Sequence, residues 1–167
     1  ICSDKTGTLT ENRMTLVLID VAGHRLQVAE HARARELLMD CGDAQACKLR
    51  DPEQLLTIIG AALCNDAVLR DTVSSGEFHA IGDPTEAAFV VAAAHFQLPK
   101  AELERVFPRI HEAPFESNRK RMTTVHRIHR DLLPTIEERY PMIRFALSSI
   151  GISHSTNPAA PHLGCTK

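Results

Sequence analysis

Apolar residues recur along the chain with two different periods, one typical of helices and one typical of strands. The clearest helical pattern opens at Asp51-Pro52-Glu53, has apolar residues at 55, 56, 58, 59, 62 and 63, and ends near Cys64. The run Met14–Val21 is rich in β-forming residues, and Ala22-Gly23 turns it back into Arg25–Ala29. This arrangement predicts a β-hairpin.

A second helix is predicted from Asp83 to about Phe96, because three start signals stand at its beginning. Asp83 can cap the helix, Pro84 suits the first helical position, and Glu86 can reach back to the cap amide. Other segments follow the same patterns. We expect strands at Glu77–Ile81, Arg109–Phe115, Arg121–His129 and Met142–Leu147, and helical segments at Glu30–Cys41, after Pro99 and near Asp131–Arg139.

Strands and helices are interspersed without the regular alternation that a parallel sheet needs. The predicted fold class is therefore α+β, with a mostly antiparallel sheet flanked by helices. The chain opens at Ile1 without a methionine and closes in a Ser/Pro/Gly/His-rich stretch, residues 151–167, that has no periodicity. We read both ends as cut from a larger protein, and we expect 151–167 to be a disordered or non-native tail.

Composition narrows the class of protein. The 167 residues are 44% hydrophobic with a net charge of −2, which fits one soluble globular domain and excludes a disordered chain. No stretch approaches 18 consecutive apolar residues, and the near-neutral charge gives no argument for nucleic acid as a partner. The five cysteines, at 2, 41, 47, 64 and 165, match neither zinc spacing nor a disulfide framework, so a reducing, cytosolic setting is expected.

Candidate chemistry lies in the first eleven residues, Ile1-Cys2-Ser3-Asp4-Lys5-Thr6-Gly7-Thr8-Leu9-Thr10-Glu11. Asp4 can act as a carboxylate nucleophile on phosphorus and carry an aspartyl-phosphate. Gly7 lets the backbone turn so that amides and the Thr8 hydroxyl cradle phosphate oxygens. A magnesium ion bridging Asp4 and the phosphate would neutralise the developing charge. The alternative is an Asp in a Gly-Thr turn without chemistry.

The string Asp-Lys-Thr-Gly-Thr-Leu-Thr resembles the phosphorylation signature of the P-type transport ATPases. The resemblance continues along the chain in Cys64-Asn65-Asp66, in Gly82-Asp83-Pro84-Thr85-Glu86 and in Phe115-Glu116-Ser117-Asn118-Arg119-Lys120-Arg121-Met122. It covers roughly residues 1–130, and the form of the last segment favours the branch that pumps calcium or other hard cations. It implies a nucleotide-binding domain, residues 14–150, preceded by residues 1–13 as the stub of a phosphorylation domain.

The resemblance also implies a function. The parent protein would couple ATP hydrolysis, through an aspartyl-phosphate on Asp4, to cation transport across a membrane. ATP and Mg²⁺ are the implied cofactors, and the remaining phosphorylation, actuator and transmembrane domains are the implied partners of this cytoplasmic domain. The implied catalytic residues are Asp4, Lys5 and Thr6, with Asp4 and Thr6 at the metal; the implied nucleotide-binding residues are Glu86, Phe115, Ser117, Arg119, Lys120 and Met122.

Each implied role has an alternative from the residues alone: core packing for Phe115, a solvated charge for Lys120, helix capping for Glu86. In the family, Phe115 matches the aromatic that stacks on adenine, and Glu86 matches the acidic residue at the adenine edge. The family's Lys-Gly-Ala segment, whose Lys closes the pocket, has no counterpart around Phe145–Gly151. Two other functions stay open, a free-standing haloacid-dehalogenase-like phosphatase and a non-catalytic nucleotide-binding module. We expect this chain by itself to bind ATP without turnover.

Overall fold

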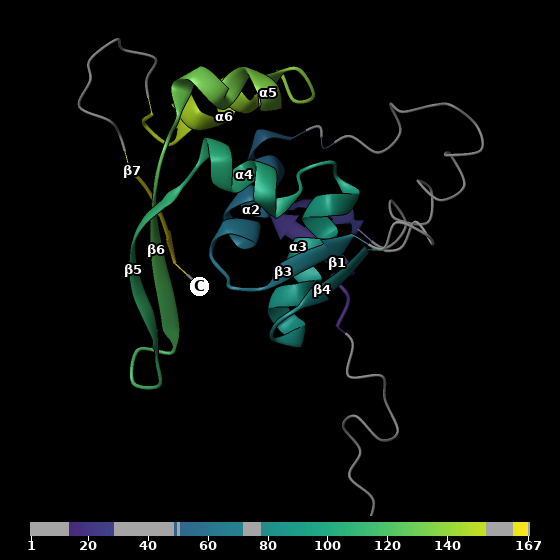
Figure 1. Cartoon of the computed structure of the whole chain (residues 1–167). Coiled ribbons are helices and arrows are strands. Elements are labelled where there is room, and N and C mark those ends of the chain that lie inside the picture. The colour runs from purple at the N-terminus through teal and green to yellow at the C-terminus, as the bar shows by residue number, and fades with distance from the viewer. Residues whose placement is uncertain (1–13, 29–48, 50, 72–77, 153–161, 167) are drawn as a thin grey trace, which may run out of the picture.

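The computed structural model describes residues 14–28, 49, 51–71, 78–152 and 162–166 (Figure 1). The fold class is α+β, as predicted. In chain order the elements are β1 (Leu18–Val21), β2 (His24–Gln27), α2 (Pro52–Leu63), β3 (Val68–Asp71), β4 (Phe78–Ile81), α3 (Pro84–His95), α4 (Lys100–Val106), β5 (Arg109–Glu116), β6 (Arg121–Arg127), η1 (Arg130–Leu132), α5 (Leu133–Glu137), α6 (Ile143–Ser149) and β7 (His162–Thr166).

Every strand pairing in these residues is antiparallel. β1 pairs with β2, and the turn between them has positive φ at both Ala22 and Gly23, which matches the twist of a tight hairpin and confirms the predicted one. β3 pairs with β4, and a three-stranded sheet has the order β5-β6-β7. The β5–β6 register runs from Arg109 opposite His126 to Glu116 opposite Arg121, with one shift between Arg109 and His111 and another between Ala113 and Glu116.

The two longest helices start where the sequence predicts. α2 carries Pro52 at its first position, and α3 begins with Pro84 after Asp83. The Asp83 carboxylate accepts hydrogen bonds from the backbone N–H groups of Thr85, at 2.9 Å, and Glu86, at 3.4 Å, so its capping role is confirmed. The helical segments expected after Pro99 and near 131–139 are α4 and the pair η1–α5.

Three segments differ from the expectation. Met142–Leu147 was expected as a strand, but Ile143–Ser149 is helix α6, because Ile143, Ala146 and Leu147 have helical spacing and are the residues it buries. Within residues 151–167, expected as a disordered or non-native tail, His162–Thr166 forms β7 and pairs with β6. Strand β3 was not predicted at all. The helix expected over Glu30–Cys41 lies outside the described residues.

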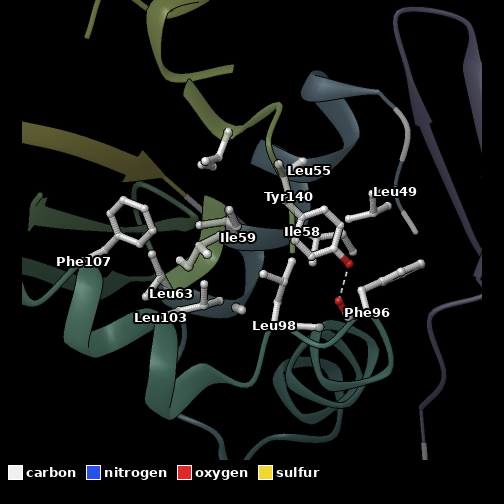
Figure 2. Close-up of a cluster of buried hydrophobic side chains, with 14 of the residues drawn as sticks. Leu49, Leu55, Ile58, Ile59, Leu63, Phe96, Leu98, Leu103, Phe107 and Tyr140 are labelled. Atoms are coloured by element: carbon white, nitrogen blue, oxygen red, sulfur yellow. Dashed lines mark hydrogen bonds between the residues drawn. The ribbon is translucent and has the colours of Figure 1, made fainter. Parts of the chain in front are cut away.

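The core forms around α2. Leu55, Ile58, Ile59 and Leu63 of this helix are at most 1% exposed, and they pack with side chains of α3, α4 and the α5–α6 region (Figure 2). Tyr140 donates its hydroxyl to the Phe96 carbonyl oxygen within this cluster, so the buried phenol has a partner. The predicted helical face over 55–63 is confirmed.

The three-stranded sheet stands at one side of the helices (Figure 1). The turn that joins β5 to β6 projects beyond the helices, at the lower left of the view. Ser117, Asn118 and Lys120 in this turn are exposed. The opposite end of β5, at Arg109, is separated from the end of α4 by two residues and is hydrogen-bonded to the end of α2 and the loop that follows it. β5 therefore connects the core to an exposed hairpin turn.

Candidate functional site

The candidate phosphorylation motif, with Asp4, Lys5 and Thr6, lies outside the described residues. The Asp4 carboxylate and the Thr6 carbonyl, which are expected at the magnesium ion, therefore lie outside them too. Among the residues that the structure describes, no group of three or more His, Cys, Asp and Glu is placed to hold a metal ion. Within that same part of the chain, no helix is long and apolar enough to span a bilayer. The described candidate residues are those expected to contact a nucleotide.

Four of these residues gather at the β5–β6 turn. Phe115 lies on β5 with its side chain 59% exposed, and Ser117, Arg119 and Lys120 follow in the turn. An exposed Phe at a projecting turn contradicts the alternative in which Phe115 packs in the core. The bulge between Ala113 and Glu116 interrupts the alternation of the strand just where Phe115 stands.

The turn itself is braced by local hydrogen bonds. Arg119 donates its Nε to a Glu116 carboxylate oxygen at 2.9 Å and an Nη to the Pro114 carbonyl oxygen at 2.9 Å. The Lys120 N–H bonds the Glu116 carbonyl oxygen at 2.8 Å, and Lys120 has a φ of +53°. These contacts fix the backbone that presents the exposed Phe115 ring, while the Lys120 side chain stays exposed.

Met122 is the candidate residue that the structure buries, at 4% exposure on β6. Thr124 and His126 lie two and four residues further along β6. Their side chains point to the same side of the strand as Met122, and both residues are fully buried. His126 Nδ1 lies 2.8 Å from the Phe107 carbonyl oxygen, and its Nε2 lies 3.0 Å from Thr124 Oγ1. Burial lowers the pKa of His126, against the opposing effect of the Phe107 carbonyl, so this ring is neutral at pH 7.

A second polar cluster surrounds the loop that follows α2, the Cys64-Asn65-Asp66 segment singled out in the sequence. Asn65 is fully buried and donates its side-chain amide to the Ala61 carbonyl oxygen at 2.7 Å. Lys100, only 6% exposed, donates to the Asn65 carbonyl at 2.8 Å, to Asn65 Oδ1 at 3.1 Å and to the Ala67 carbonyl at 2.8 Å. Burial lowers the pKa of Lys100, and Glu104 opposes that shift.

Arg109, at the start of β5, holds the same loop from the other side. Its guanidinium donates to the Leu63 carbonyl at 3.1 Å, the Asn65 carbonyl at 2.7 Å and Asp66 Oδ1 at 2.8 Å. A further bond reaches Glu112 Oε2 at 2.8 Å. Burial alone would lower the pKa of Arg109, but the bonds to the two carboxylates raise it overall. The residue therefore caps the carboxyl end of α2 with a positive charge.

Glu86 belongs to this second cluster. Its Oε2 accepts the Asp66 N–H at 3.0 Å, which joins the Gly82–Glu86 box to the Cys64-Asn65-Asp66 segment. The two segments also touch at Gly82, where a Cβ would lie 2.8 Å from Ala67 Cα. The two segments that the sequence singled out separately thus form one structural unit, and the structure accounts for the glycine by this close approach.

Glu86 and the turn that carries Phe115 are held by different parts of the domain. Glu86 is connected to the start of β5 through Asp66 and Arg109, whereas Phe115 stands six residues further along, a strand length of about 20 Å. A cleft of about 140 Å³ between β3 and α4 is lined by other residues: Val68, Leu69, Pro99, Lys100, Ala101 and Glu104. The candidate residues therefore occupy two places, joined by β5.

Sequence reasoning did not find Arg109 or Lys100. Both act on residues more than 30 positions away, so no local pattern announces them. One indirect signal was present. The predicted helix that ends before Asn65 has no basic residue in its last turn. Its last carbonyl groups therefore need partners from elsewhere in the chain, and a distant cation can supply them.

A family model described as "P-type ATPase, cytoplasmic domain N" matches residues 53–140. "Calcium-transporting ATPase 1" of Bacillus cereus is 36% identical over 126 residues, which cover 75% of this chain and 12% of that protein. "Probable cation-transporting ATPase F" of Mycobacterium tuberculosis is 35% identical over 129 residues, covering 76% and 14%. "Calcium-transporting ATPase 1" of Saccharomyces cerevisiae is 35% identical over 129 residues, covering 74% and 12%.

Proposed function

Because this chain belongs to the P-type ATPases and corresponds to their cytoplasmic domain N, we propose that it binds ATP at the β5–β6 turn. The observation that carries the proposal is Phe115, which is 59% exposed on a turn braced by its own backbone and by Arg119. An aromatic ring held in that way offers a face on which a base can stack. The neighbouring Lys120 adds a positive charge for polar fixing of the nucleotide.

The expected affinity is low. Stacking of one base on an aromatic side chain is worth about 1–3 kcal/mol. With polar contacts from Lys120, we expect a dissociation constant on the order of 0.1 to several mM, which corresponds to a binding free energy of about 3–5.5 kcal/mol. The phosphates would point towards the phosphorylation domain, so ADP and AMP should bind within a few-fold of ATP, and magnesium should change the affinity little.

The test is a chemical-shift titration of this chain with ATP. Phe115→Ala should weaken binding by about 1–3 kcal/mol, which takes it out of range at this starting affinity. Phe145→Ala is the matched control, because Phe145 on α6 is also an exposed Phe, at 65%, and lies away from the turn. Unchanged affinity in Phe115→Ala, or equal losses in both variants, would show that the adenine lies elsewhere.

For the whole protein, we propose a pump that couples ATP hydrolysis to cation transport. The chain spans only 12–14% of the length of the relatives named above, which are calcium- and cation-transporting ATPases by name. Asp4 is proposed as the residue that forms the aspartyl-phosphate, with Lys5 and Thr6 beside it. Oxygen ligands such as the Asp4 carboxylate and the Thr6 carbonyl are the kind that Mg²⁺ prefers.

A further inference from the structure

Arg119 lies in the β5–β6 turn, and its side chain reaches back towards the strand that carries Phe115. Its Nη2 donates to the Pro114 carbonyl oxygen at 2.9 Å, and its Nε donates to Glu116 Oε2 at 2.9 Å. These two acceptors belong to the residues on either side of Phe115 in the sequence. One guanidinium group therefore binds both neighbours of the ring that is proposed to stack on adenine.

The Pro114 carbonyl belongs to an irregular part of the sheet. At the register shift, two residues of β5, Pro114 and Phe115, stand against one residue of β6, Met122. A bulge of this kind interrupts the ladder of backbone hydrogen bonds that elsewhere fixes the orientation of each peptide group. Because a peptide group is planar, the Pro114 carbonyl and the Phe115 N and Cα lie in one plane. The bond from Arg119 to this carbonyl therefore fixes the direction in which the Phe115 side chain leaves the strand.

Glu116 limits what the charge of Arg119 can do. The Glu116 carboxylate lies 2.9 Å from Arg119 Nε, and the Glu116 and Arg119 side chains are 61% and 31% exposed. A guanidinium paired this closely with a carboxylate attracts a phosphate group weakly, because the carboxylate repels the same anion. The pair is therefore better suited to hold the turn in one shape than to bind the phosphates of a nucleotide.

We infer that Arg119 is a positioning residue of the nucleotide site, which together with Glu116 sets the direction of the Phe115 ring. This inference rests on the proposed nucleotide binding. It departs from the direct nucleotide contact that the sequence predicts for Arg119, because the guanidinium acts on adenine through the Pro114–Phe115 peptide group. The Glu116–Arg119 pair consequently matters as much for a ligand without phosphates as for ATP.

The experiment titrates the full 167-residue chain with ATP and with adenosine, which has the base but no phosphates, and follows the chemical shifts. The salt concentration is about 0.15 M, so that distant charges are screened. Glu116→Gln removes the carboxylate and keeps the size of the side chain. We expect this variant to bind both ligands more weakly by a similar factor, up to about fivefold, the effect of one exposed ion pair.

A phosphate-binding Arg119 predicts the opposite result for ATP. Glu116→Gln would then release the guanidinium from its carboxylate and remove a charge that repels the phosphates, so ATP would bind more tightly. The direction of the change in ATP affinity therefore separates a positioning role from direct contact.

Arg119→Lys tests the guanidinium itself. A lysine keeps the positive charge, but its ammonium group cannot reproduce the two directional bonds of the fork from one place. This variant should weaken ATP and adenosine alike, by up to about tenfold, the effect of one ordinary hydrogen bond. The double variant Glu116→Gln/Arg119→Lys should bind no more weakly than Arg119→Lys, because both substitutions remove the same interaction.

Asp20→Asn is the matched control. Asp20 also pairs across a hairpin turn, with Arg25 Nε at 2.8 Å, and its substitution makes the same change in net charge as Glu116→Gln. It lies on β1, in a different sheet from the β5–β6 turn. Both dissociation constants should therefore stay as they are in the unsubstituted chain.

Weaker binding of both ligands by Glu116→Gln, with no change in Asp20→Asn, would support the inference. Unchanged or tighter ATP binding by Glu116→Gln, a loss confined to ATP in Arg119→Lys, or an equal loss in Asp20→Asn would overturn the inference alone. Absence of ATP binding by the unsubstituted chain, or unchanged affinity in Phe115→Ala, would overturn the proposed function and the inference with it.

Discussion

The contact between Gly82 and Ala67 yields a sharp prediction about stability. Gly82 has a φ of +141°, and a Cβ placed there would meet Ala67 Cα at 2.8 Å and Ala67 Cβ at 2.9 Å. Gly82→Ala therefore introduces both a strained backbone and a steric clash. The clash is with backbone, so no side-chain rotation can relieve it.

The magnitude follows from adding the two effects. A non-glycine residue in a sparsely populated backbone region costs about 1–3 kcal/mol, and overpacking at a tight contact costs another 1–3 kcal/mol. Gly82→Ala should thus lower the free energy of unfolding by about 2–6 kcal/mol. Since small domains are stable by about 5–15 kcal/mol, this substitution removes a large fraction of the total.

Gly23→Ala is the control that separates the cost of backbone strain from the cost of the steric clash. Gly23 also has a positive φ, +85°, but nothing lies within 4 Å of a Cβ built there, so only about 1–2 kcal/mol of backbone strain is expected. Urea unfolding of the two variants and the unsubstituted chain, with equal slopes, gives the comparison. Equal losses in Gly82→Ala and Gly23→Ala would refute the argument that the loop after α2 packs against the Gly82–Glu86 box.

Two further predictions concern protonation and phosphoryl transfer. Because burial lowers the pKa of His126, the unfolded chain binds more protons than the folded one below about pH 6.5, so stability should fall on acidification through that range. His126→Gln should reduce the difference between the free energies of unfolding measured by urea at pH 5 and at pH 7.5. An unchanged difference in this variant would contradict the prediction. In the whole protein, Asp4→Asn should abolish the hydroxylamine-sensitive phosphoenzyme and leave nucleotide affinity nearly intact. Persistence of that phosphate in the Asn variant would exclude Asp4 as the nucleophile.

Local signals in the sequence predicted the elements that are stabilised locally. The Asp83-Pro84 start of α3 and the Ala22-Gly23 turn are fixed by residues next to one another, and both were predicted. The family resemblance supplied the candidate residues, and the structure places Phe115, Ser117, Arg119 and Lys120 at the β5–β6 turn. The exposure of Phe115 could not be predicted, because a Phe in a strand is more often packed inside.

Elements that depend on distant partners were missed or mistaken. β3 and β7 exist through pairing with β4 and β6, and neither has a strong pattern of its own. The segment around 145–151, where the family's pocket lysine was sought, is occupied largely by helix α6. A short apolar run does not distinguish a helix from a strand, and Met142–Leu147 is therefore mistaken for a strand in the sequence.

The central claim is that adenine stacks on Phe115 at the β5–β6 turn. The most direct test is the detection of intermolecular nuclear Overhauser effects between ATP and this chain labelled at its phenylalanine rings. We predict cross-peaks from the adenine protons to the Phe115 ring, and their loss in Phe115→Ala. Cross-peaks confined to other rings, such as Phe145 on α6, with none to Phe115 at saturating ATP, would contradict the account.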